Sequence, residues 1–390
     1  MTRDSKHKDD NHPLPKQWVG CSIEEEYLGH DRKSSKSERK IATAKDRSKY
    51  KKTDQDKLQA QAKALAKNPV PPKEDQIRGR VLAITPQGIT VQYEEGTIVC
   101  ALRGLLKKEK TQYKNLVVVG DFVYFSKQGS DEGTISSVEP RKTVLSRADN
   151  LSRRKEQLIA ANIDQVMITV SVMAPPLKPA IVDRYIIATR KGGMQPIILV
   201  NKIDLLQDDA QDEALLEQQK EMYEAFLEAY GPQETVIAIS ASTGEGMEEL
   251  QAVMKDKASV FSGQSGVGKS SLINTITGLD LKVGQIVEKT QKGAHTTTTA
   301  SLIPLSFGGW CIDTPGIKSF GVWDLKKEDI LPYFSEIHMG GEKCKYPNCT
   351  HTNEPECAVL KLVESGEISW LRYQSYVVLM DSVGREHVRR

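Results

Sequence analysis

Four short motifs in this chain have the residue types of a guanine nucleotide site. In chain order they are Asn201-Lys202-Ile203-Asp204, Ser240-Ala241-Ser242, residues 263–270 and Asp313-Thr314-Pro315-Gly316. An ordinary GTPase domain carries its phosphate loop first and its guanine-reading segments after it. Here the guanine-reading motifs come before the phosphate loop, so the sequence predicts an α/β P-loop GTPase domain that is circularly permuted.

Residues 263–270 fit the pattern G-x-x-x-x-G-K-[ST], in which backbone N–H groups wrap the α- and β-phosphates at a helix N-terminus. Residues 258–262 are typical of a buried strand and residues 270–277 of the start of a helix, which is the context that this loop needs. Lys269 is predicted to reach the β- and γ-phosphates, and Ser270 to ligate Mg²⁺. The residues predicted to bind nucleotide here are Gly263, Gln264, Ser265, Gly266, Val267, Gly268, Lys269, Ser270 and Ser271.

The segment from Asn201 to Asp204 follows an apolar run, residues 196–200, which predicts the carboxyl end of a parallel strand, where ligands bind in open α/β sheets. Guanine presents two adjacent donors that the Asp204 carboxylate can accept, whereas adenine would leave this carboxylate unpaired, so the nucleotide should be GTP rather than ATP. Asn201 is expected to brace the loops, the stem of Lys202 to lie over the base, and the backbone N–H of Ala241 to meet the guanine oxygen. The residues predicted to bind nucleotide here are Asn201, Lys202, Asp204, Ser240, Ala241 and Ser242.

The last motif and a threonine run before it predict the Mg²⁺ and γ-phosphate contacts. Asp313 supplies the carboxylate that holds Mg²⁺ through water, and Gly316 an N–H for the γ-phosphate. The second switch segment is expected after Gly316, running on into residues 320–323. The threonines at 296–299 lie in a Gly- and Lys-rich stretch that is typical of a first switch segment. We take Thr297 as the ligand of Mg²⁺ and γ-phosphate, although either neighbouring threonine fits, because a threonine run gives no register.

The residue after the last motif is Ile317, where many GTPases have a glutamine that orients the attacking water. An isoleucine cannot hydrogen-bond to water, so catalysis needs another group. His295 is the nearest side chain able to orient water or accept its proton, although a lone histidine is as often structural. The residues predicted to act in hydrolysis are His295, Lys269 and Thr297. We expect a slow intrinsic rate that depends on a partner.

A second group of residues has the spacing C-x4-C-x-H-x5-C. It consists of Cys344, Cys349, His351 and Cys357. Three thiolates and one imidazole make a closed tetrahedral zinc set, which is typical of a structural site that organises a small module. The alternatives are a reduced cysteine cluster without metal and a cargo site of a metallochaperone, and the closed set disfavours the second.

From residue 76 onward the pattern changes to short alternating strands with glycine turns. The predicted strands are residues 79–84, 88–93, 97–102, 116–124 and 133–138. Five such strands favour a small Greek-key barrel of the oligonucleotide-binding type, or OB-fold. A basic loop on this barrel is either an RNA surface or a solvated loop of a protein-binding barrel. Its cations are Arg103, Lys107, Lys108 and Lys110.

Charge distribution is more informative than the net charge, which is only +2 over 390 residues. Residues 1–75 hold 18 Lys+Arg against 13 Asp+Glu, and residues 31–52 hold 10 against 3. This basic extension is poor in apolar residues and is predicted to be largely disordered, apart from a possible helix near residues 54–67. A solvated linker and an arm for RNA phosphate fit it equally well.

The predicted compartment follows from the targeting and membrane-spanning segments that we do not recognise in the sequence. No apolar run approaches the length of a membrane span, and we recognise no secretory signal. The cysteines outside the C-terminal group are scattered, which disfavours disulfides. These features predict a cytoplasmic protein that does not associate with membranes.

The order of barrel, permuted GTPase domain and cysteine-histidine module resembles the ribosome small-subunit-dependent GTPase family of bacteria. The resemblance covers roughly residues 76–375 and includes the motifs at 263–271, 295–298 and 313–316 with the four zinc ligands. It implies a late assembly factor that binds the small (30S) ribosomal subunit and its rRNA. It also implies hydrolysis of GTP to GDP and phosphate, stimulated by the subunit, followed by dissociation.

By the same resemblance, His295 matches the catalytic histidine of the family and Thr297 its switch threonine. The expected cofactors are GTP or GDP with Mg²⁺ and one structural Zn²⁺, and the expected state is a monomer. A non-enzymatic RNA-binding scaffold that uses GTP only as a structural ligand is the competing interpretation. The predicted domains are a basic extension at 1–75, an OB-fold barrel at 76–148, the permuted GTPase domain at 149–333 and a helical zinc module at 334–390.

Overall fold

The computed structural model describes residues 76–102, 116–129, 131–148, 156–207, 212–278, 300–313 and 327–388. The predicted N-terminal extension and its helix, the basic loop of the barrel and the two predicted switch segments lie outside these residues. Among the described helices, none is both long enough and apolar enough to cross a membrane.

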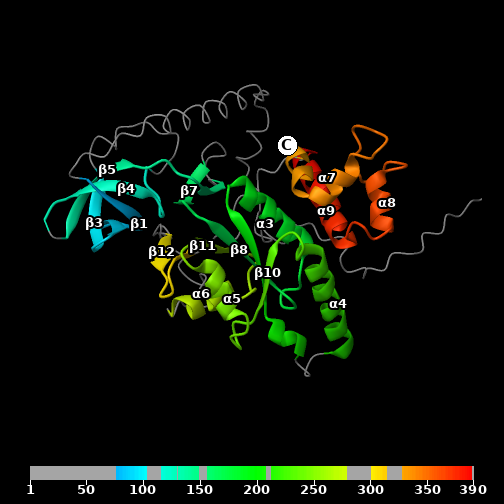
Figure 1. Ribbon diagram of the computed structural model, residues 1–390, viewed down its shortest axis with the longest axis horizontal. Coiled ribbons are helices and arrows are strands. Elements are labelled where there is room, and N and C mark those ends of the chain that lie inside the picture. Colours follow the sequence, from blue (N-terminus) through cyan, green and yellow to red (C-terminus); the bar gives the residue numbers. More distant parts are fainter. Residues whose placement is uncertain are drawn as a thin grey trace, which may run out of the picture. The chain divides into compact units, whose positions relative to one another are not determined.

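The first strands close into a five-stranded barrel (Figure 1). Its order is β1-β2-β3-β5-β4, and β4 pairs back with β1. The alternating apolar residues face inward, so Val81, Val91 and Phe125 are fully buried. The strands are β1 Ile77–Thr85, β2 Gly88–Tyr93, β3 Gly96–Leu102, β4 Phe122–Lys127 and β5 Glu132–Val138. This is the closed barrel that the sequence predicted.

The predicted strand at 116–124 is wrong in its extent, because β4 begins only at Phe122. Before it, Asp121 is fully buried, accepts a hydrogen bond from the Val118 N–H (2.8 Å) and forms an ion pair with Arg141 (2.7 Å). Gly120 has a φ of +86° and lies against the backbone of a neighbouring strand, where a Cβ would come within 2.1 Å of a carbonyl oxygen. The apolar run therefore belongs to a buried turn rather than to the strand.

The central part of the chain forms a six-stranded sheet in the order β10-β9-β8-β11-β13-β12. Every neighbouring pair is parallel except β12 with β13. The strands are β8 Gln165–Ser171, β9 Gln195–Asn201, β10 Thr235–Ile239, β11 Ala258–Ser262, β12 Ser301–Pro304 and β13 Trp310–Asp313. β11 leads into the phosphate loop and comes after β8, β9 and β10 in the chain. In the sheet it lies between β8 and β13, so the strand order reflects the circular permutation.

Helices cover both faces of this sheet (Figure 1). α5 and α6 pack against one face in a cluster that includes Met167, Leu199 and Phe261. Ile168 and Ile198 are the strand neighbours of Met167 and Leu199, so their side chains belong to the opposite face, on the side of α3. They are equally buried. The helices are α3 Pro179–Lys191, α4 Glu213–Tyr230, α5 Met247–Met254 and α6 Lys269–Thr277.

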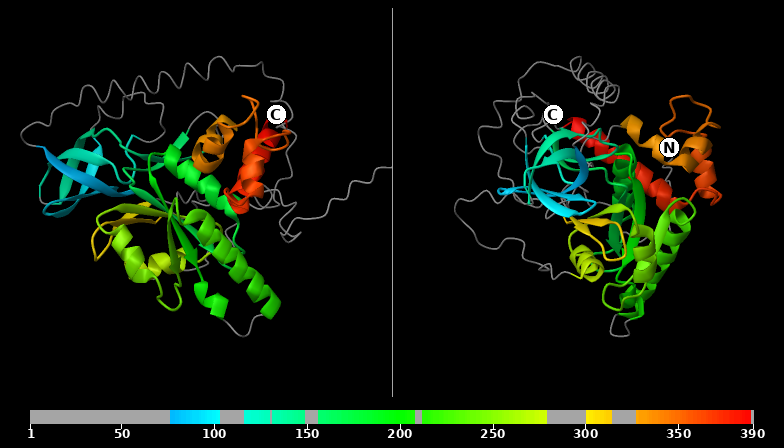
Figure 2. Two further views of the ribbon diagram at one scale, coloured as in Figure 1. Left: turned by 45° about the vertical axis from the view of Figure 1, so that its right-hand side comes forward. Right: turned by 60° about the vertical axis from the view of Figure 1, so that its left-hand side comes forward.

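A two-stranded hairpin and a helical module complete the described chain (Figure 2). The hairpin pairs β6 Val144–Ala148 with β7 Glu156–Ala161, and the predicted boundary between barrel and GTPase domain falls directly after β6. The C-terminal module consists of short 3₁₀ turns at Lys327–Asp329 and Leu331–Tyr333 and the helices α7 Ser335–Gly341, α8 Ala358–Glu364 and α9 Trp370–Val388. Its core includes Ile187 of α3.

Candidate functional site

The predicted phosphate loop lies between β11 and α6, as its motif requires. Gly263 (φ +145°) and Gly268 (φ +94°) have backbone conformations that favour glycine. A Cβ on Gly263 would come within 2.1 Å of the Thr169 carbonyl oxygen, and one on Gly268 within 2.3 Å of Asn201 Nδ2. These two glycines therefore let the loop approach its neighbouring strands closely, and the loop leads into the N-terminus of α6, a helix end of the kind that binds phosphate.

Lys269 is the first residue of α6, and its ammonium group lies within the curve of the loop. Lys269 Nζ donates to the carbonyl oxygens of Gly263 (2.8 Å) and Gln264 (2.6 Å). Carbonyl oxygens of the loop thus surround the Lys269 ammonium group. Ser270, the predicted Mg²⁺ ligand, follows in the first turn of α6 and is exposed, as are Ser265 and Gly266 of the loop.

Asn201, at the carboxyl end of β9, joins the phosphate loop to the serine motif. It is 1% exposed; its Nδ2 donates to the Val267 carbonyl (2.8 Å), and its Oδ1 accepts from the Ala241 N–H (3.2 Å). This is the bracing contact that the sequence predicted for Asn201. The Ala241 N–H, which the sequence assigns to guanine, is bonded here to Asn201 and lies beside the same cleft.

Asp204 is held from the side by a buried serine. Ser240, which is fully buried, donates through Oγ to Asp204 Oδ1 (2.7 Å), and its Oγ lies 2.9 Å from Ser242 Oγ. The Ser240 hydroxyl thus fixes the position of the carboxylate that the sequence predicts to accept two donors from guanine. Sequence spacing alone does not show that Ser240 would act through Asp204.

Lys202 links the base-reading motif to the phosphate loop. Its φ is +65°, and its Nζ donates to the carbonyl oxygen of Gly266 (2.7 Å) and to that of Ala174. Burial lowers the pKa of this lysine from its ordinary value, and the nearby Asp204 charge opposes that shift. The contacts hold the side chain across the edge of the loop.

These residues surround one open cleft with a volume of about 280 Å³. Its lining consists of Asn201, Lys202, Asp204, Leu205, Ala241, Ser242, Gly268 and Ser271. The structure therefore brings the first two motifs to the phosphate loop. Asp313 ends β13, next to the loop strand β11, while His295, Thr297 and Gly316 lie outside the described residues.

The four residues of the cysteine-histidine group converge with their ligand atoms within 4.8 Å of one another. Cys344 Sγ lies 3.8 Å from Cys357 Sγ and 3.5 Å from His351 Nδ1, and Cys357 Sγ lies 3.7 Å from the same nitrogen. A tetrahedral Zn²⁺ with ordinary bond lengths separates two sulfur ligands by about 3.8 Å and a sulfur from a nitrogen by about 3.5 Å. The donor set and its spacing thus fit zinc.

Residues that the sequence did not single out hold this metal centre. The carbonyl oxygens of Thr350 and His351 accept hydrogen bonds from the hydroxyls of Tyr376 and Tyr373 (3.0 Å each) on α9. The Glu354 carboxylate accepts from the Thr350 N–H (2.7 Å) and the Thr352 N–H (3.0 Å). Burial lowers the pKa of His351, which favours the neutral imidazole that a metal ligand needs.

Comparison with known proteins places the chain in a family. The model of the RsgA GTPase family matches residues 138–323. The relative named "Small ribosomal subunit biogenesis GTPase RsgA" from Chlorobaculum parvum is 41% identical over 278 residues, which cover 69% of this chain and 86% of that protein. Its namesake from Chlorobaculum tepidum is 37% identical, with 80% of this chain and 99% of that protein covered.

Two solved structures are similar over most of their length, each with a TM-score of 0.61. YjeQ from Thermotoga maritima is 32% identical, with 79% of this chain and 98% of that chain covered. YloQ, described as a circularly permuted GTPase, is 27% identical, with 80% and 96% covered. With these identities and this coverage, the chain belongs to the RsgA GTPase family and is a circularly permuted GTP hydrolase.

Proposed function

We propose that this protein is a GTPase of small ribosomal subunit biogenesis. It binds the 30S subunit in its GTP form, hydrolyses GTP to GDP and phosphate when the subunit stimulates it, and then dissociates. The observation that carries the proposal is the cleft in which the base-reading motifs meet the phosphate loop, in a chain whose relatives are named for this process.

The site residues have separate roles in this proposal. Asp204, with Ser240 behind it, accepts the guanine donors, and Lys269 neutralises the β- and γ-phosphates within the loop. Ser270 and Thr297 ligate Mg²⁺ directly, and Asp313 acts through water. Bound Mg²⁺ supplies charge neutralisation at the phosphates. Gly316 donates its N–H to the γ-phosphate, as the sequence predicts.

His295 takes the place of the missing glutamine in the proposed hydrolysis step. Its imidazole orients the attacking water or accepts its proton, which Ile317 cannot do. Because a neutral imidazole is required, the subunit-stimulated rate should fall when His295 is protonated at low pH. The alternative role of a structural histidine predicts that the rate survives its replacement.

The C-terminal module holds one structural Zn²⁺ in this proposal. Cys344, Cys349, His351 and Cys357 occupy all four tetrahedral positions, so the metal has no open position for substrate. Closed coordination favours a structural site over an exchangeable cargo site. The ion would add folding free energy to that of the apolar core, which α7, α8 and α9 share with Ile187 of α3.

The partner in this proposal is the rRNA of the small subunit, contacted by a monomer in the cytoplasm, where subunits are assembled. The barrel at 76–148 and the zinc module at 334–390 bind RNA on either side of the GTPase domain at 149–333, and the extension at 1–75 is a basic arm or linker. An OB-type barrel is a common RNA-binding scaffold, which supports this assignment.

GTP hydrolysis by the purified protein, with and without small subunits, tests the proposal. We expect strong stimulation by small subunits and none by large subunits, with ATP inert. Lys269→Ala should abolish all turnover, whereas His295→Ala should remove the stimulated rate and retain GDP binding. Equal slow turnover in every condition would contradict the assigned partner, and full stimulation of His295→Ala would contradict the assigned base.

A further inference from the structure

The barrel is hydrogen-bonded to the GTPase sheet at the level of the predicted Mg²⁺ aspartate. Ala83 of β1 pairs with Ser301 of β12, and Ser301 pairs in turn with Asp313 of β13. Three strands thus place these residues in one row, with neighbouring strands about 4.8 Å apart. The row joins an inner strand of the barrel to the last described residue before the second predicted switch.

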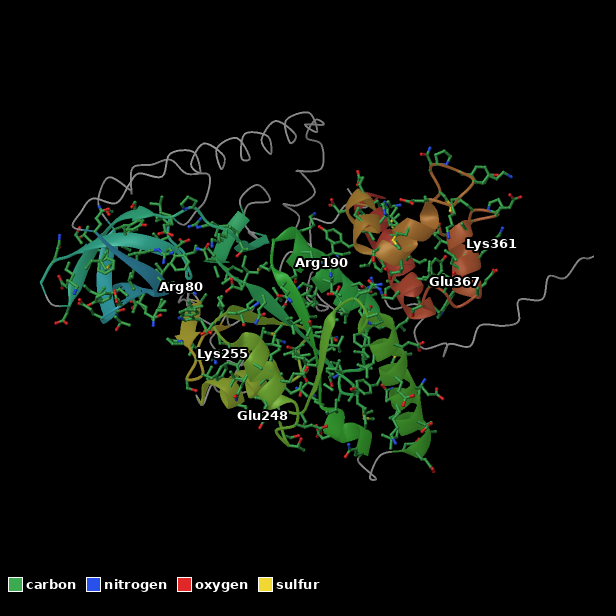
Figure 3. The ribbon with its side chains drawn as sticks, in the orientation of Figure 1. Arg80, Arg190, Glu248, Lys255, Lys361 and Glu367 are labelled. Carbon is green, nitrogen blue, oxygen red and sulfur yellow. The ribbon has the colours of Figure 1, made fainter. Side chains whose placement is uncertain are left out.

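A second contact holds the other end of β13. The indole Nε1–H of Trp310 donates to Gln92 Oε1 of β2 (3.0 Å), and the guanidinium carbon of Arg80 lies 4.4 Å from the centre of a Trp310 ring. The Arg80 guanidinium also lies near Phe122 of β4, 5.1 Å from the ring centre. Arg80 lies where β1 approaches β12 (Figure 3).

Arg80 is a buried, hydrogen-bonded side chain and not a surface cation. It is 7% exposed, and its Nη2 donates to the Asn162 carbonyl (2.8 Å), while Asn162 Nδ2 donates to the Gly120 carbonyl (3.1 Å). Burial lowers its pKa, and the opposing Asp164 charge contributes to keeping it protonated. We call Arg80, Gln92 and Trp310, together with the Ala83–Ser301 pair, the barrel junction.

Chain connectivity gives the barrel junction its significance. The predicted first switch ends just before Ala300, one residue ahead of β12, and the second is predicted to follow Gly316, three residues after the end of β13. Both predicted switches are therefore attached to one short antiparallel pair of strands, and the barrel holds that pair at both ends of β13. A movement of the barrel must displace β12 and β13 or break the junction.

We propose that Arg80, Gln92 and Trp310 are positioning residues through which docking of the barrel sets β12 and β13, and with them the backbone of Asp313, for GTP hydrolysis. This inference rests on the proposed function, because it assigns the route by which a bound subunit stimulates the reaction. None of the three residues belongs to the nucleotide cleft, so they act on hydrolysis through the backbone of β12 and β13. The inference also includes the reverse direction, in which GTP and GDP set β12 and β13 differently and the same contacts pass that difference to β1.

The first test is the ratio of subunit-stimulated to intrinsic GTP hydrolysis. Gln92→Ala and Trp310→Phe, which each remove the indole hydrogen bond, should lower this ratio at least fivefold, while Gln92→Glu, which keeps an acceptor, should restore it. Arg190→Met is the control in this assay, because Arg190 makes its ion pair with Glu234 (2.7 Å) within the GTPase domain and away from the barrel. It should leave the ratio unchanged. Lys127→Ala, which removes an ion pair with Glu95 (2.6 Å) on the barrel, is the control for the exchange experiment, where no RNA is present.

The second test needs no ribosome. Amide hydrogen exchange of β1 is compared between the GDP form and the form with a non-hydrolysable GTP analogue. We expect a nucleotide-dependent difference in the wild type that Gln92→Ala abolishes and Lys127→Ala preserves. Exchange in β1 that is indifferent to nucleotide in the wild type would overturn the inference, as would full stimulation of Gln92→Ala and Trp310→Phe by the subunit. A wild type without stimulation but with nucleotide-dependent exchange would refute the proposed function and leave the coupling standing.

Discussion

At the scale of single residues, the hydrogen bond between Ser240 and Asp204 is the contact that we expect to set the base preference. It positions the carboxylate through Oδ1 at 2.7 Å and leaves acceptor sites for the two donors that the sequence predicts from guanine. Asn201 completes the arrangement by holding the phosphate loop and the serine motif at fixed distances from this carboxylate. One buried side chain therefore connects the phosphate loop to the serine motif.

Asp204→Asn should invert the base preference. An asparagine replaces one acceptor by a donor, which repels the guanine amine and matches the carbonyl that xanthine carries at the same position. GTP affinity should fall about 100-fold or more, and XTP should bind better than GTP. Competition against a fluorescent GDP analogue measures both constants. Asp212→Asn, at the N-cap of α4, is the control and should change neither.

Gly268→Ala should damage the site through one methyl group. The new Cβ would meet Asn201 Nδ2 at 2.3 Å on a backbone with φ +94°, so the brace and the loop must both shift. Gly278, at the other end of α6, has φ +68° with nothing within 4 Å of a Cβ, so Gly278→Ala isolates the cost of backbone strain, about 1 kcal/mol. GDP affinity should drop for the first variant alone. Equal losses would show that strain, not contact, is responsible.

At this scale, the sequence indicates a functional residue when its own side chain has the chemistry to contact a ligand or metal. The motif residues of the cleft were all indicated by type and spacing, because phosphate and guanine require particular donors and acceptors. Glu354, Tyr373 and Tyr376 were not, because they act through the backbone of ligand residues and their own types carry no metal chemistry. Nothing in the local sequence relates the tyrosines of α9 to the turn around His351.

At the scale of elements, the turn between Cys349 and Cys357 depends on Glu354 as much as on its metal ligands. Burial raises the pKa of this carboxyl, but hydrogen bonds from Thr350, from its backbone and from that of Thr352 outweigh burial and hold the pKa at about 2. A pKa depressed in the folded state adds stability above the ordinary value near 4.5, and this stability is lost as pH falls toward 2.

Glu354→Gln should therefore destabilise the module in a pH-dependent way. The amide keeps the shape but turns a donor toward the N–H groups of the turn, so the variant should melt several degrees lower at pH 7. The difference from the wild type should shrink as pH falls from about 4.5 toward 2, as the wild-type carboxylate is protonated. Thermal melts across this range measure it. Glu356→Gln, at an exposed ion pair with Lys345 (2.9 Å), should melt like the wild type throughout.

Strand prediction succeeded where apolar alternation and glycine turns agreed, as in β2 Gly88–Tyr93 and β11 Ala258–Ser262. The prediction of a strand was wrong for the residues before Phe122, because a buried turn and a buried strand can have the same run of apolar residues. Asp121 with its partner Arg141 carries the distinguishing information, and that ion pair is visible only in three dimensions.

At the scale of the whole molecule, the barrel and the C-terminal module attach to different halves of the GTPase domain. The barrel contacts β12 and β13, while the module is joined to α3 and α4. The second attachment centres on Arg372 of α9, which forms a buried ion pair with Asp183 of α3, where the side chains are 4% and 2% exposed. Tyr230 of α4 donates to the same carboxylate, and the Arg372 guanidinium lies 4.9 Å from its ring centre.

Breaking the buried Arg372–Asp183 pair should lower the free energy of unfolding far more than breaking an exposed ion pair between α3 and the same module. Arg372→Met leaves Asp183 buried without its cation and should reduce the free energy of unfolding by about 3–5 kcal/mol. Lys191→Met, at the exposed pair with Asp329, should cost less than about 1 kcal/mol. Denaturant titration measures both. Adding Asp183→Asn to Arg372→Met should recover part of the loss, and a purely additive double mutant would argue against a direct interaction.

These attachments mark the limit of prediction at the largest scale. The order of barrel, permuted GTPase domain and zinc module follows from motifs that each occupy a short stretch of sequence. The barrel junction does not, because Gln92 and Trp310 are 218 residues apart and neither belongs to a motif. Contacts of this kind depend on how finished domains fit together, and no local pattern encodes that fit.

The permuted strand order also determines how the protein can be assembled during its own synthesis. β8, β9 and β10 are made first and can pair with one another, which leaves one edge of β8 open until β11 is made. The barrel is complete earlier still, but it must wait for β12 and β13 before its junction can close. Because contacts distant in sequence form slowly, we expect the junction to close last. A nascent chain thus acquires its base-reading half first, its phosphate loop next, and only then the contact that joins the barrel to the site.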